Sequence, residues 1–231
     1  MLILVLASGV LLTQNLDTLR AYVNRPVTSV RMATPLLRVQ EQDVRKILAQ
    51  FTDAGFFAMD VSGLKQALEA DPWVEQAIIR RIWPDTLTVA IQEEVPIARW
   101  GEAQLLNQYG VIFKPEDISR EQGLPLLAGP DGSAGEMMQQ YQLFSRMLQS
   151  KGLRIQVLEL SIRGSWNLVF SNEVTMQIGR EQVLDRMQRF ITFYDYRLHT
   201  QFDQISAIDL RYRNGMAIKM KSTVPIGVAA T

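Results

Sequence analysis

Nine apolar residues near the C-terminal end of this 231-residue chain form three groups of three, and the groups recur at intervals of eight residues. Inside each group the apolar positions lie two residues apart, which is the pattern of a strand with one buried face. Loops of three residues at 163–165 and 171–173 would keep all groups on one face, whereas two-residue loops would turn alternate strands over. The spacing therefore predicts a three-stranded antiparallel meander. The nine residues are Leu158, Leu160, Ile162, Trp166, Leu168, Phe170, Val174, Met176 and Ile178.

Helical patterns flank the predicted meander. The apolar faces consist of Met137, Tyr141, Phe144 and Leu148 before it, and of Val183, Met187, Phe190 and Tyr194 after it. This spacing predicts two amphipathic helices, the second of which covers the apolar face of the sheet. Further upstream, a strand at 97–100 and a hairpin that turns at Tyr109-Gly110 are expected. The segment 124–133, LPLLAGPDGS, is rich in Gly and Pro and is predicted to be a turn-rich link.

A last hairpin is predicted from Ile208 onward. A three-residue loop at 213–215 keeps the faces separate, with Gly215 in the left-handed conformation, whereas a two-residue turn would mix them. The expected pairs are Tyr212 with Met216, Leu210 with Ile218, Ile208 with Met220, and Asp209 with Lys219. The second strand, 216–221, is then expected at the sheet edge. Such an edge either binds a partner or is protected from aggregation by its two lysines, Lys219 and Lys221. The residues alone favour neither interpretation.

The first half of the chain has a different order of elements. A β-rich run at 27–32 is followed by helical spacing at Val44, Ile47, Leu48 and Phe51. A second short helix is expected, with Ser62 as its N-cap and Asp71-Pro72 as its stop. Strands at 74–82 and 87–93 follow. The order β-α-α-β-β, before a β-rich part, predicts an α+β protein of two domains.

The first 16 residues carry no charge and are strongly apolar through Leu12. As a helix they would span about 24 Å, short of the roughly 30 Å hydrocarbon core of a bilayer. No basic region precedes them, as a secretory signal would require. A buried core helix is the alternative, but residues 2–6 have no polar side. We therefore expect the end of a transmembrane helix, in contact with lipid.

Composition excludes several classes of function. The chain has 24 basic and 24 acidic residues, and a net charge of zero argues against sequence-independent nucleic-acid binding. The absence of Cys excludes disulfides and thiolate metal sites, and the single His excludes a His-rich site. No glycine-rich phosphate loop or dinucleotide motif is present. We expect no metal, no cofactor and no nucleic-acid partner.

Two pairs of residues could be mistaken for catalytic groups. Asp195 and His199 fall near a helix end, where a His suits the helix dipole, so we expect neither to be catalytic. Glu93 and Glu94 are adjacent on a strand and point to opposite faces, which prevents them from acting on one substrate. We predict that the chain is not an enzyme.

A series of short motifs resembles the bacterial cell-division family FtsQ/DivIB. Each motif is weak alone, but their order is specific, and the resemblance covers nearly the whole chain. The motifs are Trp73-Val74, RRIWPDTL at 80–87, EEVPIARW at 93–100, LPLLAGPDGS at 124–133, Ile178-Gly179-Arg180 and IDLRYRNGMA at 208–217.

The resemblance implies a non-enzymatic scaffold of the divisome, anchored in the inner membrane of a Gram-negative bacterium by one span, with its main body in the periplasm. It implies that the last strands of the β domain bind FtsB and FtsL, and that a POTRA domain binds an upstream division protein. The expected parts are a transmembrane helix at 1–16, a linker at 17–26, a POTRA domain at 27–95, a β domain at 96–221 and a tail at 222–231. The β domain is expected to be an antiparallel sheet with covering helices. The expected partner-binding residues are Arg163, Tyr212, Asn214, Met216, Ile218 and Met220.

The chain departs from the family pattern in two places. Met220 stands where an aromatic residue is common, and the family's basic cytoplasmic flank does not precede the apolar run. The arginines that follow the run would by themselves place the body in the cytoplasm. One alternative function is a POTRA-bearing envelope transport or assembly component, which would ordinarily show repeated POTRA units or a long barrel. Another is an envelope hydrolase, for which no nucleophile motif is present.

Overall fold

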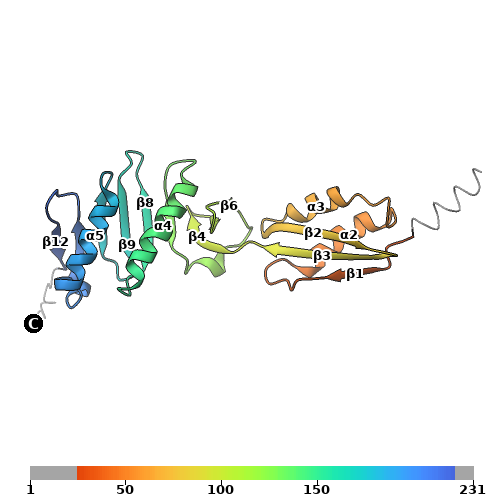
Figure 1. The fold of residues 1–231 in the computed structure, drawn as a ribbon, viewed down its shortest axis with the longest axis horizontal. Coiled ribbons are helices and arrows are strands. Elements are labelled where there is room, and N and C mark those ends of the chain that lie inside the picture. The colour runs from red at the N-terminus through yellow and green to blue at the C-terminus, as the bar shows by residue number, and fades with distance from the viewer. Residues whose placement is uncertain (1–24, 222–231) are drawn as a thin grey trace, which may run out of the picture. The chain divides into compact units, whose positions relative to one another are not determined.

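The computed structural model of the chain describes residues 25–221, which are coloured in Figure 1. The described residues divide into two compact units, 25–94 and 95–221. The first unit contains a three-stranded sheet and the second a nine-stranded sheet. Helices accompany both sheets, which confirms the predicted α+β class.

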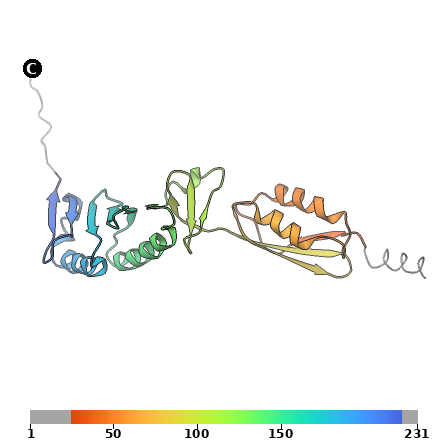
Figure 2. The same cartoon turned by 90° about the horizontal axis from the view of Figure 1, so that it is seen from above.

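The first unit has the predicted order β-α-α-β-β. Its elements are β1 (Ser29–Met32), α2 (Glu41–Thr52), α3 (Val61–Glu69), β2 (Val74–Ile82) and β3 (Thr86–Glu93). The central strand is β3, which pairs in parallel with β1 and antiparallel with β2. Leu87, Val89 and Ile91 alternate along it and are at most 3% exposed. They share one core with Leu48 of α2 and Leu64 of α3. The two helices lie on the same side of the sheet (Figure 2).

The N-cap of α3 is Asp60, so the prediction of Ser62 is wrong. The Asp60 carboxylate accepts a hydrogen bond from the Gly63 N–H at 2.9 Å. This bond satisfies one of the donors that the first helical turn leaves unpaired. Asp and Ser are both preferred caps, and the apolar spacing allows either. The charged carboxylate is additionally favoured beside the positive end of the helix dipole.

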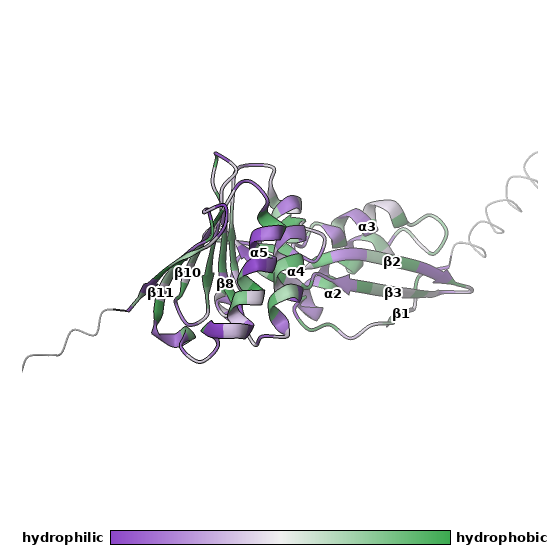
Figure 3. Cartoon of the chain, turned by 60° about the vertical axis from the view of Figure 1, so that its left-hand side comes forward, coloured by the Kyte–Doolittle hydropathy of each residue, from purple (hydrophilic) through white to green (hydrophobic). Residues whose placement is uncertain are grey.

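The second unit is one sheet with helices on one face. The sheet is mixed, so the expectation of an antiparallel sheet is wrong at three strand pairs that are parallel, namely β4–β7, β7–β8 and β10–β11. Its strand order is β12-β11-β10-β9-β8-β7-β4-β5-β6. Figure 2 shows α4 and α5 on the same side of this sheet, and Figure 3 shows apolar and hydrophilic residues alternating along these helices and strands. The strands are β4 (Pro96–Trp100), β5 (Gln104–Asn107), β6 (Ile112–Phe113), β7 (Leu126–Ala128), β8 (Ile155–Leu160), β9 (Trp166–Phe170), β10 (Thr175–Gly179), β11 (Ile205–Asp209) and β12 (Ala217–Met220). The helices are α4 (Ala134–Gln149) and α5 (Val183–Phe193), with the short turns η1 (Ser119–Glu121), η2 (Tyr194–Leu198) and η3 (Phe202–Gln204).

Aromatic rings fill the core between this sheet and its helices. Phe170 of β9 lies 6.0 Å from Phe190 of α5 and 5.4 Å from Phe202, measured between ring centroids. The ring of Phe144 on α4 contacts Trp166 edge-on at 6.3 Å. All five residues are buried. Burying a side chain of this size contributes on the order of 1.5–3 kcal/mol, so these contacts fix both helices on the sheet.

The segment Leu126–Ala128 forms β7 inside the sheet, so the prediction that 124–133 is only a link is wrong. β7 pairs in parallel with both β4 and β8. Three residues are too few to show a strand pattern, and the flanking Pro125 and Gly129 are typical of turns. Pairing on both sides satisfies the backbone of β7, and Leu127 is fully buried, so tertiary contacts override the local signal.

The predicted meander consists of β8, β9 and β10. Leu168 pairs with Leu158 on one side and with Met176 on the other, which places the apolar groups on one face. The loop between β9 and β10 has the predicted three residues, because the Phe170 N–H donates to the Val174 carbonyl across it.

The loop between β8 and β9 is shifted by one residue from the predicted position 163–165. Leu160, rather than Ile162, pairs with Trp166, and the Ser161 N–H donates to the Ser165 carbonyl at 2.9 Å. The Ser161–Ser165 pair therefore closes a three-residue loop at 162–164, and Ile162 is 94% exposed instead of lying in a strand. The register differs by two residues, which leaves the other side chains on their predicted face.

Within residues 25–221, no helix combines the length and the hydropathy that crossing a bilayer requires. The helix predicted at 1–16 and the tail predicted at 222–231 lie outside the described residues.

Candidate partner-docking site

The strand β12 forms one edge of the nine-stranded sheet. It pairs with β11, and no strand among the described residues pairs with its other side. Directly after it, the Lys221 N–H donates to the Gln204 carbonyl at 2.7 Å and so points toward the β11 side. Successive backbone N–H groups point to opposite sides of a strand. The N–H groups of Ile218 and Met220 therefore point away from β11, toward the open edge.

The hairpin between β11 and β12 has a register different from the predicted one. The observed pairs are Ile208 with Ile218, Asp209 with Ala217, and Ala207 with Lys219. The predicted pairing of Leu210 with Ile218 is wrong, because the connection contains residues 210–216 instead of three. Gly215 is also not among the glycines with a positive φ. The difference of two residues keeps Ile218 and Met220 on the helix-covered face.

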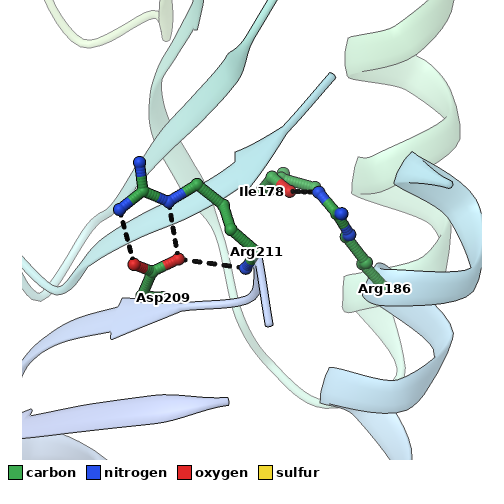
Figure 4. Close-up of polar contacts among 4 residues, drawn as sticks. All are labelled: Ile178, Arg186, Asp209 and Arg211. Carbon is green, nitrogen blue, oxygen red and sulfur yellow. Dashed lines mark hydrogen bonds and ion pairs between the residues drawn. The ribbon is translucent and has the colours of Figure 1, made fainter. Parts of the chain in front are cut away.

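The start of this connection is fixed by Asp209, at the end of β11 (Figure 4). Its carboxylate accepts hydrogen bonds from the backbone N–H, Nε and Nη2 of Arg211 at 3.0, 2.9 and 2.7 Å. These side-chain bonds hold the pKa of Asp209 below its ordinary value and raise the pKa of Arg211. The Leu210 N–H donates to the Gln177 carbonyl of β10. Leu210 therefore continues the contact with β10 beyond the last pair between β11 and β12, which is Asp209 with Ala217.

Arg189 of α5 holds the rest of the connection. Its Nη1 donates to the Arg213 carbonyl at 2.8 Å, and its Nη2 donates to the Leu210 and Tyr212 carbonyls, both at 3.1 Å. These carbonyls lie outside the strand ladder, and one guanidinium satisfies all three. A side chain from α5, and not the turn residues Asn214-Gly215, therefore sets the backbone of the connection.

A second arginine of α5, Arg186, fixes the end of β10. Its Nη1 donates to the Ile178 carbonyl at 2.7 Å (Figure 4). At Gly179, where φ is 88°, a Cβ atom would lie 2.5 Å from that Nη1 and 3.2 Å from Cγ of Arg211. The close approach and the left-handed backbone both require glycine. The motif Ile178-Gly179-Arg180 thus has a structural role beside the 210–216 connection.

The structure places the six predicted partner-binding residues in two segments. Arg163 is in the β8–β9 loop and the other five are in the last hairpin. In the hairpin, Tyr212 (58% exposed) and Asn214 are exposed, Met216 and Ile218 pack partly against the core, and Met220 is 44% exposed. The strand pairings put the 162–164 loop and the 210–216 connection at the same end of the sheet.

The surroundings of Arg163 extend this surface. Arg163 lines a shallow groove together with Asp131, Glu159 and the exposed Ile162. One exposed cation and one exposed apolar side chain therefore lie at the end of the sheet that also presents Tyr212. A partner that reaches across this end would meet both.

The residues that shape the site, Arg186, Arg189 and Asp209, were not predicted from the sequence. The two arginines are three residues apart and border Met187 and Phe190 of the buried face of α5. Arginines at the margin of an apolar helix face are a signal for carbonyl partners in a neighbouring segment.

The residues considered as catalytic candidates have structural contacts. The Asp195 carboxylate accepts a hydrogen bond from Lys151 Nζ at 2.6 Å, and His199 is exposed just after η2. The Glu93 carboxylate accepts bonds from the backbone N–H groups of residues 37–39. Among residues 25–221, no three potential metal ligands come together.

Two family models match the chain. A model of the FtsQ-type POTRA domain matches residues 25–94, and a model of the C-terminal domain of cell division protein FtsQ/DivIB matches residues 98–211.

Curated relatives named cell division protein FtsQ are also similar. The protein from Cellvibrio japonicus is 39% identical over 203 residues, which cover 88% of this chain and 63% of that protein. The protein from Hahella chejuensis is 32% identical over 88% of this chain and 73% of its own length. The protein from Coxiella burnetii is 30% identical over 95% of this chain and 90% of its own length.

Proposed function

This chain belongs to the FtsQ/DivIB family of cell-division proteins, and we propose that it acts there as a non-catalytic scaffold. In this proposal a β domain at 96–221 binds FtsB and FtsL, and a POTRA domain at 27–95 binds an upstream division protein. The observation that carries the proposal is the edge strand β12, with outward N–H groups at Ile218 and Met220. An added partner strand would pair with these groups.

The side chains of β12 support docking and define the partner's chemistry. Ile218 and Met220 share one face, and Met220 is 44% exposed. Lys219 lies on the opposite face and is exposed. A partner strand with apolar residues on the helix-covered face and an acidic residue beside Lys219 would complement both faces. In this proposal Lys219 contributes to partner selectivity. In an edge strand that binds no partner, the same lysine would only prevent edge-to-edge aggregation.

Replacing Ile218 by Pro tests this mechanism. Proline removes the outward N–H and leaves the hydrogen bonds between β12 and β11 in place, since that N–H does not point toward β11. We expect the Ile218→Pro chain to remain folded and to lose FtsB binding by at least about tenfold, as measured by calorimetric titration.

The control is Ile218→Val, which keeps the N–H and nearly all of the side chain. We expect its affinity for FtsB to stay within about twofold of the original. A folded Ile218→Pro chain with unchanged affinity would rule out strand addition. Binding would then be assigned to the side chains around Tyr212.

The same proposal places the chain in the inner membrane, with its body in the periplasm. The support is the uncharged apolar sequence at 1–16 together with the family membership. A reporter that is active only outside the cytoplasm, fused after Thr231, should be active. A normally expressed but inactive fusion would reverse the proposed orientation.

A further inference from the structure

A groove on the second unit lies away from the docking strand. Its volume is about 700 Å³, and its walls come from β4, the 122–125 segment, α4, the start of β8 and the β9–β10 turn. Sites for small molecules typically measure about 300–1,000 Å³. Four strand steps separate β8 from β12, or about 19 Å at roughly 4.8 Å per step. The groove is therefore a separate candidate site.

The charge of this groove is one-sided. Its lining contains Arg99, Arg146 and Arg154, and it contains no Asp or Glu. The whole chain, in contrast, has equal numbers of basic and acidic residues. Three arginines in one concave surface without a lining carboxylate create a local positive potential that attracts anions.

Arg99 is held in position before any ligand arrives. Its Nε donates to the Leu124 carbonyl at 3.2 Å, and its Nη1 donates to Oε1 of Gln122 at 3.0 Å. A guanidinium has five N–H donors, so three remain for a ligand. Because these bonds already restrict the half-buried side chain, binding would cost little additional conformational entropy.

Arg146 and Arg154 are available for a ligand. Arg146 is on α4 and Arg154 immediately precedes β8, and both are exposed. Within residues 25–221, neither side chain has a hydrogen-bonding or ion-pairing partner. Tyr141, Ser145 and Gln149 of α4 line the same groove and supply neutral polar groups.

We propose that this groove binds a small ligand that carries at least two carboxylate or phosphate groups. The planar guanidinium fork matches both anions through paired hydrogen bonds. Three arginines from separate segments offer more hydrogen-bond donors than one anionic group can use. We therefore expect the ligand to carry at least two carboxylate or phosphate groups. The proposal gives the chain a ligand site that is independent of β12.

Binding is tested on the full chain in a non-ionic detergent at about 150 mM salt, which screens weak non-specific attraction. Citrate is the carboxylate probe and pyrophosphate is the phosphate probe, each titrated by calorimetry. We expect saturable binding of at least one probe, and the stronger probe identifies the type of anion. In an Arg146→Gln/Arg154→Gln variant we expect the dissociation constant to rise at least about tenfold.

The control carries the same change in charge outside the groove, in an Arg180→Gln/Arg197→Gln variant of two exposed arginines. We expect its affinity for the probe to stay within about twofold, and the thermal unfolding of both variants to match the original chain. Absence of saturable binding of either probe overturns the proposal. Equal weakening in both double variants also overturns it, because the attraction would then come from net charge alone.

Discussion

At the scale of single residues, the last hairpin depends on Arg189, which donates to three carbonyls of the 210–216 connection. Replacing Arg189 by Ala leaves these carbonyls without their charged donor. We expect the free energy of unfolding of the β domain to fall by about 2 kcal/mol, since hydrogen bonds to charged groups contribute about 1.5–3 kcal/mol each and water replaces part of the loss. Affinity for FtsB should fall as well, because Tyr212 loses its fixed position. Denaturant unfolding and calorimetric titration measure the two effects.

The neighbouring residue Gln188 provides the control for this prediction. It is exposed on the same helix, and its side chain makes none of the contacts to the hairpin. Gln188→Ala should change stability by less than about 0.5 kcal/mol. If Arg189→Ala retained full FtsB affinity, the backbone of the connection would not need its carbonyl cap for docking.

The pH dependence of the hairpin follows from the lowered pKa of Asp209, which its bonds to Arg211 cause. A lowered pKa means that the ionised carboxylate stabilises the folded loop at every pH above the ordinary value of 3.8. This stabilisation is lost only as the pH falls through the folded-state pKa, below 3.8. We therefore expect the Asp209 carboxyl carbon to titrate below 3.8 in an NMR measurement of the folded chain. A midpoint at or above that value would show that the bonds to Arg211 do not form in solution.

At the scale of elements, the N-cap of α3 can be tested directly. Asp60→Ala removes the acceptor for the Gly63 N–H and should lower the stability of the first unit by about 1 kcal/mol. Ser62→Ala, at the position that the sequence suggested, should change it by less than about 0.5 kcal/mol. Thermal unfolding of the two variants distinguishes the caps. An equal loss in both would contradict the assignment of Asp60.

Elements with repeated signals were predictable, and elements fixed by distant partners were not. The alternation along β3 and the apolar triplets of β9 and β10 predicted buried faces that the structure confirms. β7 could not be found, because its three residues become a strand only between β4 and β8. Period-two patterns determine which face a side chain takes, but a shift of two residues leaves every side chain on its face, so they do not determine the register. This is why the pairings of β8 with β9 and of β11 with β12 both differ from the prediction by two residues.

The candidate site shows the same division. The edge position of the last strand and the placement of Ile218 and Met220 on one face followed from the sequence order and the alternation. The Arg189 cap and the Asp209–Arg211 contact did not, because a guanidinium on a helix can reach many carbonyls. Only the packing of α5 against the sheet selects the three that it binds.

At the scale of the whole molecule, two separate hydrophobic cores underlie the two units. Leu64 belongs to the core of the first unit and Leu168 to that of the second, and both are almost completely buried. A Leu→Ala change at such a site typically costs about 2–5 kcal/mol. If each core stabilises its own unit, each change should act on one unit alone.

Hydrogen exchange measured along the chain tests this separation. Leu64→Ala should speed amide exchange within residues 25–94 and leave both the protection of β8–β10 and the affinity for FtsB unchanged. Leu168→Ala should speed exchange in the second unit and weaken FtsB binding, because the β domain opens more often. If Leu64→Ala deprotected β8–β10 to the same extent, the two units would unfold as one. Partner docking at β12 would then depend on both cores.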